Sequence, residues 1–421
     1  MITHRRYICV RIISLICLLA LSYMSCSKKL VSTYHYDIKD IPLIDLYQEA
    51  YICDDALLYA PYHYVADLFY EQIVRVNVHF LNSESRSHNY KEAEGVRLVT
   101  ELLHNANERL IKNFRMNLPV GNETAALNPM YQYQLWQADE DEDGIYFHYD
   151  DELCFFANKG KYRNNYHMDV IDNYAIGLDS VINIFIMPHI PKKKRTAKYK
   201  VTQTGVALGH GLKIAGLYES GKESWEFATL LNHEIGHILG LHHTWSSNDG
   251  CDDTPRHANC WGPTDKKPCI DISNNLMDYN NSQMAITPCQ IGRIHKNFND
   301  LSSDQRSLIV KQWCDYDSSS AIEIITEEHW KSAKDLNRDI RIMHGGQLII
   351  SCRLHMAEGA KIIVEPGGLL TLDHATLHND CGGQWGGIEA LQRGKMRGLV
   401  VRTDGSEIRD VGRRDLTSDL Q

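Results

Sequence analysis

Apolar and polar residues recur with distinct periods over the first three quarters of the chain, and these periods predict its elements. Residues 73–80 alternate between apolar and polar side chains, which predicts a half-buried strand. Residues 91–116 carry apolar side chains at spacings of three and four, which predicts a long amphipathic helix. Residues 131–136 have strand character, and the apolar run 181–187 predicts a strand in the middle of a sheet. Helical spacing returns over residues 225–240.

The pattern changes after residue 320. Gly345-Gly346 and Gly367-Gly368 each open a short apolar segment, and the two pairs lie 22 residues apart. Short strands with glycine turns at a constant interval predict a β-solenoid, and this part resembles the opening coils of a right-handed parallel β-helix. A small β-sandwich or an unrelated meander is the alternative. We assign residues 319–395 to this module, which we expect to be separable from the preceding domain, and residues 396–421 to a polar tail.

The N-terminus has the layout of an export signal. Three arginines lie within the first 11 residues, and the apolar run 12–24 follows them. That run has 13 residues, fewer than the roughly 20 that a membrane-spanning helix needs. It ends at a small residue before Cys26, which resembles a bacterial lipoprotein cleavage site. We therefore predict a signal peptide over residues 1–25 and a leader or linker over residues 26–70; ordinary cleavage with Cys26 as a bystander is the alternative.

Lipidation of Cys26 sets the predicted location. Two or three acyl chains on one residue would anchor the protein stably, since each buried CH₂ contributes about 0.8 kcal/mol. We expect a lipid-anchored protein of the bacterial cell envelope, at the outer membrane or the cell surface, with secretion as the alternative. The membrane is thus one predicted partner.

Composition and charge narrow the class of protein. The chain has 421 residues, of which 43% are hydrophobic and 23% charged, as in ordinary globular proteins of two to three domains. Lys and Arg number 44 and Asp and Glu number 54, so the formal net charge is −10. A nucleic-acid partner is not expected, because phosphate binding needs a basic surface. Oligomeric state does not follow from these numbers.

A histidine pattern in the segment 233–243 predicts a metal site. His233 and His237 are four residues apart, so on a helix they project from one face and reach a single ion. Gly240 can adopt a left-handed conformation and end that helix. The chain then turns back and delivers His243 as the third ligand, with the adjacent His242 as the alternative. Three nitrogen ligands leave one position open, which is the arrangement of a catalytic zinc ion, Zn²⁺.

Glu234 is the predicted general base of this site. It lies next to His233 on the same helical turn. A carboxylate there can accept a proton from a zinc-bound water molecule and later pass it to the leaving amine. The spacing therefore predicts hydrolysis of peptide bonds, and its partner is a protein or peptide substrate.

The long form of this motif resembles that of the metzincin metallopeptidases. The wider pattern is similar to the pappalysin (cytophagalysin-type) family: His243-Thr244-Trp245, Asp253-Thr254-Pro255, Asn275-Leu276-Met277-Asp278-Tyr279 and the segment 286–293 match it in order. The resemblance covers about residues 70–316. It implies an α+β zincin catalytic domain, which we place at residues 71–318, with a twisted mixed sheet, two long helices and an irregular C-terminal subdomain.

The resemblance also implies roles for single residues. Met277 would form the Met-turn, an apolar floor under the metal. Tyr279 would stabilise the oxyanion with its hydroxyl group. The glycine-punctuated stretch 205–218 would supply an edge strand with which an extended peptide pairs. Asp249, Asp252 and Asp253 would be candidates for a structural Ca²⁺ site, although their order is not that of an EF-hand.

Cysteines are numerous for an exported chain. Twelve are present, and nine remain once the signal cysteines and Cys26 are set aside, so at least one thiol stays free or pairs with another molecule. Four of them bracket the segment after the third histidine: Cys251, Cys260, Cys269 and Cys289. Four cysteines allow three pairings, and a structural zinc site is the rival interpretation. Cys53 is a weak candidate for a zinc-blocking cysteine switch.

We conclude from the sequence that the chain is a zinc-dependent endopeptidase with a β-rich module. The rival is a surface adhesin or glycan-binding lipoprotein in which the zinc domain is inactive or secondary. Glu234 and Tyr279 argue against that rival, because metal binding alone needs neither side chain.

Overall fold

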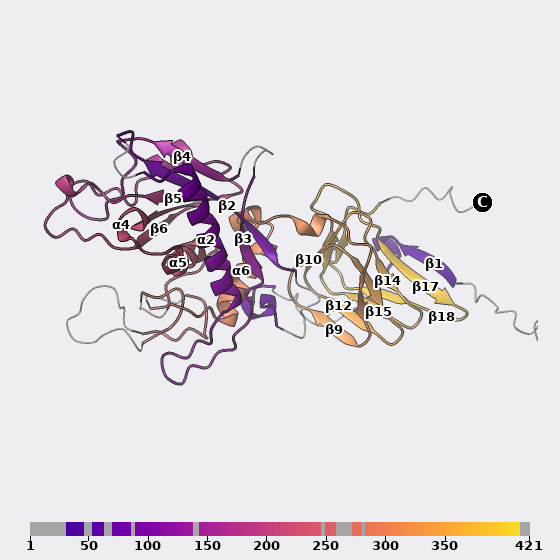
Figure 1. Cartoon of the computed structure of the whole chain (residues 1–421). Helices are drawn as coiled ribbons and strands as arrows, with labels where there is room; N and C mark the ends of the chain where they lie inside the picture. The colour runs from indigo at the N-terminus through magenta and orange to yellow at the C-terminus, as the bar shows by residue number, and fades with distance from the viewer. Residues whose placement is uncertain are drawn as a thin grey trace, which may run out of the picture.

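The structure is a computed structural model that describes residues 31–45, 53–62, 70–85, 89–137, 143–245, 249–257, 272–279 and 283–412. The predicted signal peptide and Cys26 lie outside these residues, as do Cys260 and Cys269. Within the described residues, no helix combines the length and the apolar character needed to cross a membrane. In Figure 1 the described chain forms two regions side by side, an N-terminal mixed region and a C-terminal region made of strands.

A six-stranded sheet forms the centre of the N-terminal region, in the order β3-β2-β5-β7-β6, with β4 also paired to β2. Its strands are β2 (Gln72–Asn82), β3 (Tyr131–Leu135), β4 (Ile145–Tyr149), β5 (Ile182–Met187), β6 (Thr204–Leu208) and β7 (Gly211–Ala215). All pairs are parallel except β6 with β7, which is antiparallel. The sheet is therefore mixed, and β6 lies at its edge.

Two helices cover one face of this sheet. The helices of the region are α2 (Glu92–Ile111), α3 (Asp169–Tyr174), α4 (Leu217–Ser220), α5 (Ala228–Ile238) and α6 (Pro288–Asn299). The apolar residues of α2 and α5 form one core with the inner face of β2 and β5, and α2 crosses that face in Figure 1. Short 3-10 segments connect the elements: η1 (Ile38–Asp40), η2 (Ala56–Tyr59), η4 (Lys192–Lys194), η5 (Ser224–Glu226), η7 (Asp304–Leu308) and η8 (Gln312–Cys314). The helix predicted over residues 91–116 ends five residues earlier.

Strand β2 differs from its sequence prediction in burial. The alternation predicts one wet face, yet Asn77 and His79 are fully buried. A second apolar cluster, which includes Phe185, covers that face of the sheet. His79 stacks on Phe185 and its Nε2 lies 2.9 Å from Asn183 Oδ1, so the polar side chains of the strand find partners inside the protein.

Three parallel sheets form the C-terminal region: β8-β11-β14-β17, β9-β12-β15-β19 and β10-β13-β16-β20. The strands are β8 (Ala321–Ile324), β9 (Glu327–Trp330), β10 (Lys334–Leu336), β11 (Asp339–Ile342), β12 (Gln347–Ile350), β13 (Arg353–Met356), β14 (Ile362–Val364), β15 (Leu369–Leu372), β16 (Thr376–His378), β17 (Ile388–Arg393), β18 (Met396–Arg397), β19 (Leu399–Arg402) and β20 (Glu407–Ile408). Ile340 pairs with Ile362 and Leu348 with Leu370, so neighbouring strands are offset by the predicted 22 residues. The predicted β-rich character is confirmed.

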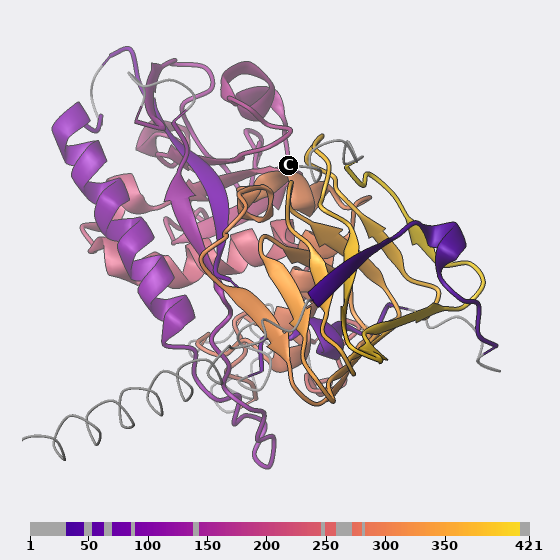
Figure 2. The ribbon, with the colours of Figure 1, turned by 90° about the vertical axis from the view of Figure 1, so that its right-hand side faces the viewer.

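Both ends of the strand region differ from the ranges predicted for it. Three strands lie within residues 396–408, where a polar tail was predicted, because Leu399, Val400 and Val401 continue the apolar pattern. Part of the predicted leader also belongs here. Strand β1 (Val31–Tyr36) pairs antiparallel with β17, and Leu43 forms a bridge with Arg402 beside it. In Figure 2, β1 lies in front of the strand region, and the N-terminal region lies behind it.

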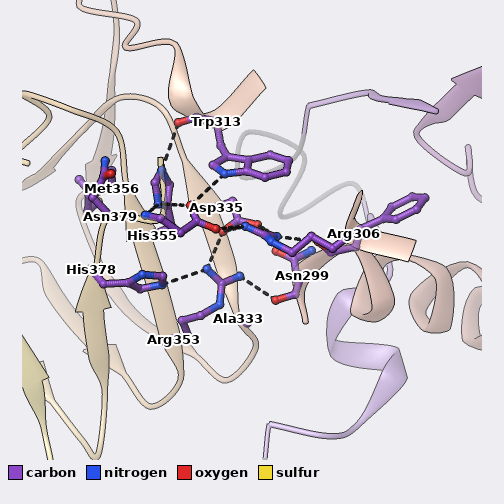
Figure 3. A network of polar contacts seen from close by, with 12 residues as sticks. Asn299, Arg306, Trp313, Ala333, Asp335, Arg353, His355, Met356, His378 and Asn379 are labelled. Carbon is purple, nitrogen blue, oxygen red and sulfur yellow. Dashed lines mark hydrogen bonds and ion pairs between the residues drawn. The ribbon is translucent and has the colours of Figure 1, made fainter. Parts of the chain in front are cut away.

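Disulfides and one cluster of buried charges join the two regions. Cys53 pairs with Cys352, and Cys314 pairs with Cys381. We call Arg306, Trp313, Asp335, Arg353 and Asp380 the junction cluster (Figure 3). Arg306 bridges Asp335 and Asp380 at 2.6 Å each, and Arg353 contacts Asp335 at 2.6 Å. The Trp313 indole donates to Asp380 and lies under the Arg306 guanidinium.

The junction cluster keeps its charges in a buried place. Burial by itself raises the pKa of Asp335, but the guanidinium groups of Arg353 and Arg306 outweigh it and hold that pKa below its usual value. The pKa of Asp380 is also lowered, because its hydrogen bonds with His355 and Arg306 outweigh the effect of burial. Both carboxylates are therefore ionised at neutral pH and neutralise the buried arginines.

Candidate active site

Helix α5 presents His233 and His237 one turn apart, as their spacing predicts. Gly236 lies between them, and a Cβ atom there would stand 2.6 Å from the Met277 sulfur. Only glycine allows Met277 this close to the helix. Met277 is fully buried beneath the histidine-bearing turn, where the sequence places it as an apolar floor.

A left-handed glycine ends helix α5 and redirects the chain. Gly240 has a φ of +97°, a conformation that side-chain-bearing residues rarely adopt. The Asn297 side-chain amide donates to the Leu239 carbonyl at 2.9 Å and holds this end of the helix. The chain then returns His243 to the other two histidines. His237 Nε2 lies 3.2 Å from His233 Nε2 and 2.9 Å from His243 Nε2.

Backbone carbonyls orient two of the imidazole rings. His233 Nδ1–H donates to the Leu276 carbonyl at 2.8 Å, and His237 Nδ1–H donates to the Leu241 carbonyl at 2.9 Å. With a proton on Nδ1, the Nε2 lone pair is free to bind a metal ion. His243 stacks on Trp245 with ring centroids 4.1 Å apart, which fixes the third ring.

The three Nε2 atoms fit a zinc ion. Two ligands at about 2.0–2.1 Å from tetrahedral zinc lie roughly 3.3–3.4 Å apart, close to the separations observed here. Burial, followed by the neighbouring imidazoles, lowers the pKa of His233 to about 4 and that of His243 to about 3. The rings are therefore neutral at physiological pH, the form in which histidine binds metal. Neutral lone pairs that face one another at this distance repel unless a cation lies between them.

Glu234 lies against the edge strand β6. Its side chain is only 6% exposed, and a Cβ atom on Gly205 would stand 2.6 Å from its Cγ. Gly205 therefore leaves the space that the carboxyl group occupies. Burial raises the pKa of Glu234 to about 7, with a smaller opposing effect from a hydrogen bond with the Ala207 backbone. A carboxyl group with this pKa can both accept and release a proton near neutral pH.

Tyr279 joins the histidines from the segment after Met277. Its ring centroid lies 4.7 Å from that of His243 and 5.6 Å from that of His233. Burial, with the nearby Glu234 as a smaller cause, raises its pKa, so the hydroxyl group stays protonated and can donate a hydrogen bond. Histidines, Glu234, Met277 and Tyr279 thus come from two segments some 40 residues apart and meet in one place.

Two residues of this site carried no predicted role. Asp278 is fully buried between Met277 and Tyr279, and His257 Nε2 contacts its carboxylate at 3.0 Å. The other Asp278 oxygen accepts from the Tyr279 backbone N–H at 2.6 Å. This pair fixes the turn that carries both neighbours. Asp278 is part of the quoted motif, but nothing in the spacing of His257 signals the contact.

The loop between the third histidine and α6 answers two further predictions. Cys251 pairs with Cys289, one of the pairings left open. Asp249 accepts hydrogen bonds from Cys251 N–H and the Thr254 hydroxyl, and Asp253 from the Thr287 hydroxyl and Cys289 N–H.

Two of the remaining cysteines also answer the sequence analysis. Cys53 is bonded to Cys352, so it is no cysteine switch. Cys154 is a free and buried thiol, in keeping with the odd count.

Three imidazoles, a buried glutamate and an edge strand beside them define a metallopeptidase. Residues 158–299 match the model of peptidase family M43, described as Pregnancy-associated plasma protein-A. The chain therefore contains a pappalysin-type metallopeptidase domain, as its motifs predict, and this family implies a catalytic zinc ion.

The solved structures that resemble the chain are more distant. Mature mirolysin of Tannerella forsythia, solved with a cleaved peptide, is 18% identical, with 56% of this chain and 95% of that chain covered at a TM-score of 0.38. Mirolysin in complex with compound 9 is 19% identical, with 57% and 96% covered at a TM-score of 0.39. No match is found among curated proteins.

Proposed function

We propose that the chain is a zinc-dependent endopeptidase that cleaves proteins or peptides. The observation that carries this proposal is the convergence of the three Nε2 atoms, oriented by carbonyls, beside a buried glutamate with a pKa of about 7. His233, His237 and His243 would hold the ion. Zinc, when bound, supplies a Lewis acid that lowers the pKa of water and polarises a carbonyl oxygen.

The protein's own groups move the protons. Glu234 accepts a proton from the attacking water molecule and returns it to the amine nitrogen of the leaving peptide. The protonated Tyr279 hydroxyl donates a hydrogen bond to the carbonyl oxygen as negative charge develops there. Met277 keeps the floor under the histidines apolar and Asp278 holds the turn in place.

Strand β6 is proposed to bind the substrate backbone. It is the edge strand of the sheet and its only partner among the described strands is β7. An extended peptide can add to such an edge through main-chain hydrogen bonds. Because Glu234 packs against Gly205 on this strand, a peptide bound there would pass directly beside the base.

The C-terminal region is proposed to be a β-solenoid that begins near residue 319. Parallel sheets with a 22-residue offset support this proposal. We further propose lipidation at Cys26, five residues before β1. A chain of five residues spans at most about 18 Å. The anchor would thus be attached at the end of the strand region remote from the peptidase domain, which would hold the peptidase away from the membrane. A structural Ca²⁺ ion near Asp252 remains a prediction.

Hydrolysis of casein by the purified chain tests the proposed function. We expect cleavage that stops when a zinc chelator is added and returns with excess zinc. The variant His233→Ala/His237→Ala, prepared in the same way, controls for contaminating proteases. Absence of zinc-restored cleavage from the wild-type protein would contradict the proposal.

A further inference from the structure

A cavity of about 510 Å³ lies between the C-terminal half of α2 and the start of α5. Leu276 and Gln283 line it, and both also contact His233 on its Nδ1 side: the Leu276 carbonyl accepts from Nδ1, and Gln283 Nε2 lies 3.3 Å from it. The Nε2 atom of the same ring faces the other two histidines. The cavity and the metal-binding site therefore share the His233 ring as a wall.

Large apolar side chains surround this cavity and remain exposed. Phe114, Trp225 and Met284 line it with exposed fractions of 53%, 51% and 46%. Leu110 and Ile286 complete the apolar part of the wall. Exposed apolar side chains that converge on a cavity mark a binding site for a partly apolar group.

The charged residues of the cavity do not cancel. Glu108 and Lys112 form an ion pair with each other at 2.6 Å. Arg109 donates to two neutral acceptors, the Thr229 hydroxyl at 2.5 Å and the Trp225 carbonyl at 3.2 Å. It forms no ion pair with any residue in the described part of the chain. A half-buried guanidinium group therefore leaves the cavity with one uncompensated positive charge.

We infer that this cavity binds a substrate side chain adjacent to the scissile bond and that Arg109 makes it select an acidic one. The inference rests on the proposed peptidase function. A guanidinium group has five N–H donors, and the two acceptors named leave some free for a carboxylate. The apolar wall accommodates the stem of a glutamate side chain. A lysine or arginine side chain would meet a like charge, and the only carboxylate that lines the cavity is already paired with Lys112.

Cleavage of matched peptides by the zinc-loaded chain tests this inference. A peptide library first locates the substrate position with the strongest preference, and quenched peptides with Glu, Gln, Leu or Lys at that position are then compared. We expect kcat/KM for Glu to exceed that for Gln by about tenfold, as a hydrogen-bonded charge pair contributes, with Lys the poorest. In Arg109→Gln the Glu and Gln peptides should be cleaved equally, while Arg109→Lys should keep part of the preference.

Arg97→Gln is the matched control, because Arg97 is an exposed arginine on the same helix that does not line the cavity. It should keep the full preference for Glu. An Arg109→Gln protein that slows all four peptides alike shows that Arg109 only supports Trp225 and Thr229, and overturns the inference. A wild-type preference for Lys, or none at all, overturns it too. Failure of the wild type to cleave any peptide or casein contradicts the proposed function itself.

Discussion

Glu234 and the histidines of the active site differ in what their loss should change. Glu234 packs on Gly205 and contacts no other histidine-bearing element, so Glu234→Gln leaves all three Nε2 atoms in place. We expect this variant to keep its zinc and lose peptide hydrolysis. His243→Ala should instead lose most of its zinc, since two nitrogens bind far more weakly than three. Atomic absorption beside turnover of a quenched peptide distinguishes the two.

Normal turnover by Glu234→Gln would exclude it as the base. A full zinc content in His243→Ala would show that another residue, with His242 the nearest, completes the site. His242 is exposed, whereas His243 stacks on Trp245 toward the other rings. The structure therefore favours His243.

Tyr279 should affect the rate more than the metal. The variant Tyr279→Phe removes one hydroxyl group and keeps the ring that packs on Trp245 at 4.4 Å. Removal of one oxyanion donor typically costs about 10²–10³ in kcat. We expect a loss of this size with unchanged zinc content and melting temperature. A loss of zinc would instead indicate that Tyr279 supports the ligands.

At the scale of single elements, the end of α5 decides where the third ligand lies. Gly240→Ala would place a Cβ atom 2.4 Å from the Asn297 amide in a backbone conformation that disfavours it. We expect weaker zinc binding, because His243 follows three residues later. Gly221→Ala is the control, since Gly221 also has a positive φ but has open space around it. Equal zinc affinities for the two variants would contradict a role of this turn in placing His243.

Element prediction from the sequence worked where one face of an element decides its environment. The helical spacings of α2 and α5 and the apolar run of β5 correspond to observed elements, because their periods reflect a single buried side. Strand β2 was harder. Its polar residues are buried by a second layer that comes from α3 and residues 154–156, and no local pattern in β2 reports that layer.

At the scale of the whole molecule, the junction cluster should stabilise the contact between the two regions. Asp335→Ala leaves Arg306 and Arg353 without their shared carboxylate in a buried place. Loss of one partner of a buried ion pair typically costs about 3–5 kcal/mol. We expect a loss of this order in the free energy of unfolding by urea. Asp404→Ala, at an exposed position, should change it by less than about 0.5 kcal/mol.

The acid sensitivity of the wild type follows from the same cluster. The pKa values of Asp335 and Asp380 are lowered in the folded protein, so their contribution is complete above the unfolded value of about 3.9 and is lost as the pH falls below it. An Asp335→Ala protein whose stability equals that of the wild type at pH 7 would show that the cluster contributes nothing.

The same contacts bear on whether the peptidase domain stands alone. The glycine period predicts a separable β module, but a chain ended near residue 318 would lose Cys352 and Cys381 and leave Cys53 and Cys314 unpaired. We expect such a chain to bind zinc but to unfold at lower temperature and to aggregate through the uncovered Trp313. Calorimetry and size-exclusion chromatography compare it with the full chain. An unchanged melting temperature would support the separable module.

The sequence by itself determined the metal ligands, the base and the Met-turn, because three imidazoles on one ion impose a strict local spacing on a helix and the turn after it. It also determined the 22-residue offset of the C-terminal strands, which glycine turns repeat along the chain. Only the tertiary structure decided which cysteines pair, that His257 contacts Asp278, that β1 joins a sheet some 350 residues later, and that Arg109 faces a cavity beside His233. Those contacts join segments far apart in the chain, and no local period records which distant surface a side chain will meet.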